Sequence, residues 1–207
     1  MTSKKEFDDA KKILQNEVKG TVESVWNSRN QFLRQFNRTD GWTLLNELLQ
    51  NAVDEGAKNV EISLGDDSET LEFRHDADPD KSKLGTKEIV GLCAYSKSSK
   101  GLGTVGFMGI GFKSFLRFFR EVNISQKQVD FTISVKDMKN RNPNLPDLYS
   151  PVWNDSKDHS DQTVFIFSNP RGDAISTLED SLEVLDPIRF AVLATRGLEQ
   201  LKIGGRE

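Results

Sequence analysis

The sequence predicts an α+β domain: a two-layer sandwich in which a mixed, mostly antiparallel sheet carries helices on one face. The order of the patterns supports this class, because helical spacing comes first, a hairpin follows, and adjacent strands dominate after two further helical segments. No internal repeat interrupts that order. With 207 residues, 36% hydrophobic and 29% charged, the chain can bury one sizeable core, so residues 1–207 are predicted to form a single domain.

The amino-terminal part is predicted to be helical. Residues from about 4 to 36 carry apolar positions at helical intervals, and form an N-terminal helical extension that reaches to about residue 40. Either Asp40 or Thr43 is suited to cap the next helix, which bears Glu47. Gly56 is expected to end that helix in the left-handed conformation.

A hairpin and a short helix are predicted next. Residues 60–64 and 70–75 alternate between apolar and polar positions on either side of a polar turn, as in a β-hairpin. A short amphipathic helix follows at 86–95. The small, polar, glycine-rich stretch 96–105 is either a plain connection or a mobile lid, and its place before three further glycines favours the lid.

The rest of the chain is predicted to be mostly strand. The predicted elements are a helix at 112–119, strands at 122–124, 129–135 and 163–167, helices at 178–185 and 187–195, and a last strand at 198–203. A proline-containing surface excursion spans 138–161. Because the chain stops directly after the last strand, we expect it to be the N-terminal fragment of a larger protein.

Composition excludes several functional classes. A formal net charge of −4 argues against a surface built to hold nucleic acid. The single cysteine, Cys93, lies among apolar residues and is expected to be a packed thiol. Neither His75 nor His159 has a partner at metal-ligand spacing, which disfavours a zinc site. There is no secretory start and no long apolar run, so we expect a cytoplasmic protein with no membrane contact.

The first chemical signal is the segment Glu47-Leu-Leu-Gln-Asn51-Ala-Val-Asp54. On a helix, residues at i, i+4 and i+7 share one stripe, so Glu47, Asn51 and Asp54 lie together while the leucines occupy the other side. Taken alone, such a stripe is more often a solvated face than a site.

The second signal is Gly106-Phe-Met-Gly109-Ile-Gly111-Phe-Lys113-Ser114. Glycines spaced in this way let backbone N–H groups approach an anion at a helix N-terminus. A dinucleotide-binding fingerprint requires a strand directly before the glycines, whereas the preceding residues here read as a flexible loop. No phosphate-loop consensus occurs either.

In this order and spacing, the two motifs resemble the ATPase superfamily of gyrase B, the ninety-kilodalton heat-shock chaperones, histidine kinases and MutL (GHKL, or Bergerat fold). The resemblance covers roughly residues 44–167 and is greatest to the sacsin-type, heat-shock-chaperone-like branch. It implies that Asn51 binds Mg²⁺ and that Glu47 orients or deprotonates the attacking water. Asp54 matches an acidic position near the nucleotide, with a structural role as the alternative. Gly106, Gly109 and Gly111 would line the phosphates.

Other residues near the second motif have two interpretations each. Lys113 would place a positive charge beside the phosphates, or would simply follow the helix surface. Ser98 and Ser99 lie in the predicted lid, where they would touch phosphate on closure or only keep the loop hydrated. Phe112 belongs to the ATP-binding segment by position, and its spacing with Phe115, Phe118 and Phe119 predicts packing in the core.

The adenine-binding half departs from the family pattern. The family reads adenine with an aspartate in D-x-G-x-G, whereas residues 74–79 here are Arg-His-Asp-Ala-Asp-Pro, without glycine. Asp76 is predicted to accept from the adenine amino group, with Asp78 second and a solvated acidic loop as the alternative. Thr163 resembles the threonine that supports this aspartate, and an ordinary strand threonine is the alternative.

The resemblance implies an ATPase: a Mg²⁺-dependent, slowly hydrolysing ATP-binding module that drives lid closure and conformational change in a larger chaperone-like or remodelling protein. Two alternatives stay open. One is a nucleic-acid-associated clamp like MutL or the MORC proteins, dimerising on nucleotide binding; the other is an interaction module that binds ATP without cleaving it. A histidine kinase is disfavoured, because no histidine precedes His75. ATP is thus the expected partner, a nucleotide-dependent homodimer is left open, and nucleic acid is not indicated.

Overall fold

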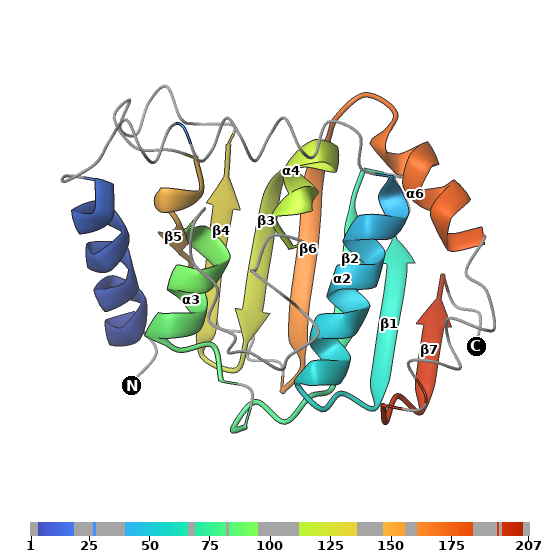
Figure 1. Ribbon diagram of the computed structural model, residues 1–207, viewed down its shortest axis with the longest axis horizontal. Coiled ribbons are helices and arrows are strands. Elements are labelled where there is room, and N and C mark those ends of the chain that lie inside the picture. The colour runs from blue at the N-terminus through green and yellow to red at the C-terminus, as the bar shows by residue number, and fades with distance from the viewer. Residues whose placement is uncertain are drawn as a thin grey trace.

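The described part of the computed structural model comprises residues 4–18, 27, 40–65, 69–81, 83–94, 112–135, 147–155, 161–183, 194 and 196–204. In it, seven strands form one sheet in the order β5-β4-β3-β6-β2-β1-β7. Every neighbouring pair is antiparallel except β1 and β7, which are parallel. Figure 1 shows the helices on one face of this sheet. The predicted α+β class with a mixed, mostly antiparallel sheet is therefore confirmed.

The first helix packs near one edge of the sheet, against β4 and β5. Residues 4–18 are helical, and their buried side chains recur at helical intervals. The ring of Phe7 lies 5.7 Å from that of Phe131 in β4 (Val129–Ser134) and 5.4 Å from that of Trp153 in β5 (Val152–Trp153). No helix among the described residues is both long and apolar enough to span a membrane.

The helix that carries the first motif, α2 (Gly41–Asp54), is fixed at both ends. At its start, Asp40 Oδ1 accepts hydrogen bonds from the Thr43 N–H at 3.0 Å and the Thr43 hydroxyl at 2.8 Å, so Asp40 is the cap. A Cβ on Gly41 would lie 2.9 Å from the Thr177 carbonyl, because α2 begins directly against α6 (Ala174–Glu183).

The end of α2 is closed by Gly56, as predicted. Gly56 has φ +86° and donates to the Val53 carbonyl, and the Ala57 N–H donates to the Ala52 carbonyl. This pair of bonds satisfies the last carbonyls of the helix and turns the chain sharply into β1 (Asn59–Leu64).

The predicted hairpin forms with β1 paired to β2 (Leu71–His75), and β2 then pairs with β6 (Thr163–Pro170). Next to β6 lies β3 (Phe119–Gln126), and β7 (Gln200–Ile203) lies beside β1. The short helix α3 (Thr86–Cys93) follows the hairpin along the chain.

Several predicted boundaries differ from the structure, and in two segments the predicted assignment itself is wrong. The segment after the glycines is not one helix to Phe119: a 3-10 turn η2 (Phe112–Ser114) and the short α4 (Phe115–Phe118) end where Phe119 pairs with Pro170 and starts β3. The excursion at 138–161 contains the 3-10 turn η3 (Asp147–Tyr149) and the edge strand β5, which were not predicted. In both places strand pairing with distant residues decides the local structure.

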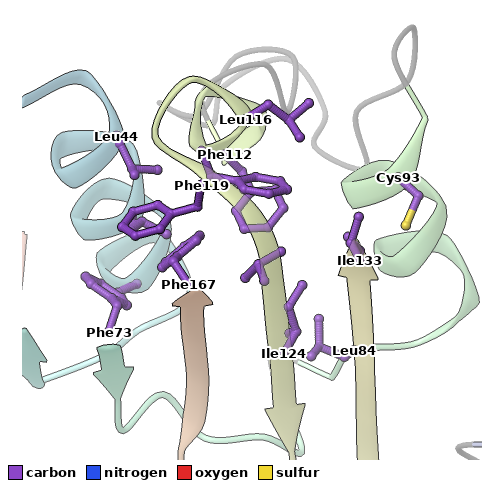
Figure 2. Close-up of a cluster of buried hydrophobic side chains, with 14 of the residues drawn as sticks. Leu44, Phe73, Leu84, Cys93, Phe112, Leu116, Phe119, Ile124, Ile133 and Phe167 are labelled. Carbon is purple, nitrogen blue, oxygen red and sulfur yellow. The ribbon is translucent and has the colours of Figure 1, made fainter. Parts of the chain in front are cut away.

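The core fills the space between the sheet and its helices. Figure 2 shows side chains from α2, η2 and the central strands meeting there, among them Leu44, Phe112 and Phe167. All four phenylalanines predicted to pack in the core are buried: Phe112, Phe115, Phe118 and Phe119. The opposite face of the sheet carries mostly polar side chains, and Asn123 and Asn154 both donate to Asp130 there.

Replacing Phe167 with alanine is expected to lower the free energy of unfolding by about 3–5 kcal/mol, because its fully buried ring contacts other core phenylalanines and would leave a cavity. Urea unfolding followed by circular dichroism measures this. Ile13→Ala is the control, since Ile13 is 42% exposed and its loss should change stability by less than about 1 kcal/mol. Equal effects of the two substitutions would contradict the described core.

Candidate functional site

The stripe predicted on α2 lies beside, and not within, the buried face of the helix. Leu44, Leu45, Leu48 and Leu49 are buried, whereas Glu47 and Asn51 are partly exposed. At the end of the helix, Asp54 Oδ1 lies 3.8 Å from the guanidinium of Arg196, which gives this carboxylate an ion-pair partner within the protein. Contact of Asp54 with a nucleotide stays a prediction.

A polar row crosses one end of the sheet face that α2 covers. It consists of His75 at the end of β2, Thr163 at the start of β6 and Gln126 at the end of β3, all at most 2% exposed. His75 and Thr163 are directly opposite in the β2–β6 register. The next rows on the same face are apolar: Phe73, Phe165 and Ile124, then Leu71, Phe167 and Val122.

Hydrogen bonds connect this row to the segment before α3. Gln126 Nε2 donates to Thr163 Oγ1 at 2.9 Å, and Gln126 Oε1 accepts from the Leu84 N–H at 2.9 Å. A buried amide with both ends bonded avoids the cost of unpaired polar groups. Gln126 therefore links β3 to β6 and to Leu84 in the segment before α3.

His75 is buried in its neutral form. Burial lowers the pKa of His75 to about 4, against an opposing effect of the Asp76 charge. Nδ1 accepts from the Ala77 N–H at 3.3 Å, so the imidazole proton resides on Nε2, which faces Glu55 Oε2 at 3.6 Å. The site thus holds an N–H donor beside a carboxylate at the end of α2.

An aromatic surface adjoins the polar row. Phe165 is partly exposed, although its row neighbours Phe73 and Ile124 are buried. Its ring is stacked on that of His75, with centroids 6.4 Å apart, and lies 5.7 Å from the ring of Phe112 in η2. A flat apolar ring is therefore accessible next to buried hydrogen-bonding groups, on the helix-covered side of the sheet.

Asp76 has a different set of neighbours. Its carboxylate accepts from the backbone N–H groups of Lys58 and Asn59, both at 2.8 Å, and from the Asn59 side chain. Burial alone would raise the pKa of Asp76, but these hydrogen bonds from Asn59 and Lys58 lower it below its ordinary value. Asp76 thus joins the end of β2 to the start of β1, which favours a structural role. Its contact with adenine stays a prediction.

The alternative, Asp78, lies in a local turn. Its Oδ1 accepts from the Asp80 N–H at 3.0 Å, and its Oδ2 lies 3.7 Å from the Lys81 amine. These contacts favour a role in shaping the loop after β2. The structure does not bring Asp76 or Asp78 into the polar row.

Lys113 is turned inward. Its side chain is fully buried, and Nζ donates to the Gly91 carbonyl in α3 at 2.9 Å. Burial lowers the pKa of Lys113 to about 8 and raises that of the neighbouring Cys93 thiol to about 12, so Cys93 is an unreactive core residue as predicted. The bond to Gly91 links η2 to α3, and contact of Lys113 with phosphate stays a prediction.

The glycines predicted to bind phosphate and the predicted lid lie outside the residues that the structure describes. Ser98, Ser99, Gly106, Gly109 and Gly111 lie outside the described residues, as does the whole stretch 96–105. Within the described residues, no group of three or more His, Cys, Asp or Glu side chains could hold a metal ion. Comparisons with models of known protein families and with curated proteins found no match to this sequence.

Four residues of this site were not predicted from the sequence: His75, Gln126, Phe165 and Glu55. Strand alternation was a usable signal for the first three, since it places them on the apolar face of their strands. Their proximity depends on pairing between strands far apart in the chain. Glu55 follows the last residue of α2, and no pattern indicated that it faces His75.

His75 predicts a specific pH dependence of stability. Its folded pKa of about 4 lies below the ordinary value near 6.5, so the unfolded chain takes up the proton first as pH falls. This stabilisation is complete above about pH 6.5 and is lost between that pH and about 4, roughly 2–3 kcal/mol by pH 4.5. His75→Gln should therefore lose less stability between pH 7 and 4.5 than the native protein does, measured by urea unfolding. Equal losses would contradict a neutral buried His75.

Proposed function

We propose that this chain is an ATP-binding and slowly hydrolysing domain of the Bergerat type, with its nucleotide site on the helix-covered side of the sheet, beside α2. One observation carries the proposal. The helix that bears Glu47 and Asn51 covers the same sheet face that holds the polar row His75, Thr163 and Gln126. The helix that carries the first motif and the buried polar row therefore lie on the same side of the sheet.

The polar row and Phe165 suit a purine base. Polar groups buried in an otherwise apolar helix–sheet interface are costly unless they are paired or serve a ligand. The ring of Phe165 offers a flat apolar contact, and the Thr163 hydroxyl and His75 N–H are adjacent hydrogen-bonding groups. Small-molecule sites commonly combine apolar and aromatic walls with a few such polar groups.

Asn51 fits the expected role toward Mg²⁺. It offers an amide oxygen on a partly exposed helix face, and Mg²⁺ is held in nucleotide sites by one or two protein ligands, phosphate oxygens and water. When bound, the ion would neutralise charge on the phosphate oxygens. Glu47 lies one helical turn before Asn51, where its carboxylate can orient or deprotonate a water next to the same phosphates.

In this proposal the domain is the nucleotide-driven part of a larger, cytoplasmic, chaperone-like or remodelling protein. The lid at 96–105 and the glycines after it would close over the phosphates. Lys113 and Gln126 connect to the two ends of α3, which precedes that stretch directly, so nucleotide contacts at either place would be transmitted to the start of the lid.

Replacing Glu47 with glutamine should reduce ATP hydrolysis by about 100-fold or more while leaving Mg²⁺-ATP affinity within a few-fold of native, because the amide cannot accept the proton of the attacking water. Single-turnover hydrolysis and calorimetric binding measure the two quantities. Glu61→Gln is the matched control. Glu61 is exposed on β1, and its substitution removes the same charge. Hydrolysis by the Glu47 variant at the native rate would exclude Glu47 as the base.

Replacing Asn51 with alanine should weaken binding of Mg²⁺-ATP by roughly tenfold or more, and should have little effect on ATP binding measured with a chelator, because only the metal contact is lost. Isothermal titration with and without Mg²⁺ makes the comparison. Asn46→Ala on the same helix is the control. Unchanged Mg²⁺-ATP affinity in the Asn51 variant would exclude the metal role.

A further inference from the structure

The orientation of the Gln126 amide is determined by its partners. The Leu84 backbone N–H can only donate, so the atom that faces it at 2.9 Å must be the amide oxygen. The amide nitrogen therefore faces Thr163 Oγ1, also at 2.9 Å, and donates to it. Because Gln126 is 2% exposed, water does not compete freely for either bond.

This orientation constrains the hydroxyl of Thr163. Since Oγ1 accepts a hydrogen from Gln126, the hydroxyl hydrogen must point toward another group. Thr163 is 1% exposed, and within the described residues the hydrogen bond from Gln126 is the one that its hydroxyl makes. A buried donor without an acceptor costs about 1–3 kcal/mol.

The neighbours of Thr163 do not supply that acceptor. His75 lies directly opposite, but its Nδ1 already accepts from the Ala77 N–H and its Nε2 carries the proton. Two residues farther along β6 is the partly exposed ring of Phe165. An aromatic surface beside an unused O–H donor fits a heteroaromatic ring with an acceptor nitrogen.

We propose that Gln126 is a positioning residue for the base. It orients the Thr163 hydroxyl to donate to a ring nitrogen of adenine, and through Leu84 it ties that contact to the segment leading into α3. This inference rests on the proposed ATP site. Gln126 itself acts through Thr163 and touches no reacting atom.

Gln126→Glu tests the proposal at nearly constant shape. In its ionised form, the carboxylate can still accept from the Leu84 N–H but cannot donate to Thr163, so the hydroxyl turns to donate to the carboxylate and withdraws its hydrogen from the base. Because burial raises the pKa of a carboxyl, binding is measured at about pH 8.5. Gln128→Glu is the matched control, because it adds the same charge at an exposed position of the neighbouring turn. Circular dichroism establishes that each variant is folded.

The measurement is the affinity, in the presence of Mg²⁺, for ATP and for its 1-deaza, 3-deaza and 7-deaza analogues, each of which lacks one of the three acceptor ring nitrogens of adenine. The native protein and the Gln128 variant should bind one analogue about tenfold more weakly than ATP, the value of one hydrogen bond. Gln126→Glu should lose about tenfold in ATP affinity and little for that analogue, so the discrimination disappears. If this variant does not fold, Gln126→Met is used instead; it removes the hydrogen bond that orients the hydroxyl without capturing its hydrogen, so the discrimination should fall only in part.

The results that would contradict the role of Gln126 differ from the result that would contradict the ATP site. Equal weakening of ATP and analogue, or native affinities that do not distinguish them, would overturn the role of Gln126 and leave the ATP site standing. Absence of any binding of Mg²⁺-ATP to the native protein would overturn both.

Discussion

The antiparallel register between β2 and β6, with His75 opposite Thr163, is the constraint on which the rest of the structure depends. Side chains alternate between the faces of a sheet, so a slip of one residue would move the whole apolar set of a strand to the wrong side. This register brings Phe73 beside Phe165 and Leu71 beside Phe167 in the core. It also places the polar row at one end of the helix-covered face, and so determines the core and the candidate site together.

The position of α2 over this face follows from its two ends. Asp40 accepts from the Thr43 N–H at the start of the helix, Gly41 allows close approach to α6, and Gly56 turns the chain into β1. Asp76 then holds the ends of β1 and β2 together through hydrogen bonds to the backbone. The partly exposed stripe of α2 and the buried polar row are thus carried by a well-connected scaffold, as a site that must keep its geometry requires.

Much of the scaffold was predictable because its signals are local. Helical periodicity and the residues Asp40 and Gly56 predict α2 correctly, and alternation predicts the hairpin. The segment after the glycines was assigned to one helix because its phenylalanines are spaced helically, whereas the pairing of Phe119 with Pro170 ends the helix earlier. The site was harder to predict: the side of α2 that bears Glu47 follows from periodicity, but Gln126 meets Thr163 only through strand pairing across 37 positions. The motif places Asp76 at the adenine-reading position, whereas its hydrogen bonds to the start of β1 depend on strand pairing that the motif does not specify.

We expect a nucleotide to bind on the helix-covered side of the sheet, beside α2 and the polar row. The most direct measurement is a titration of isotopically labelled protein with Mg²⁺-ATP, followed by the NMR signals of individual backbone and side-chain amides. We expect saturable changes that fit a single site, concentrated at Asn51, Thr163 and the side-chain amide of Gln126, with little change at Asn123 and Asn154 on the opposite face. Absence of saturable change, or changes concentrated on the uncovered face, would contradict it.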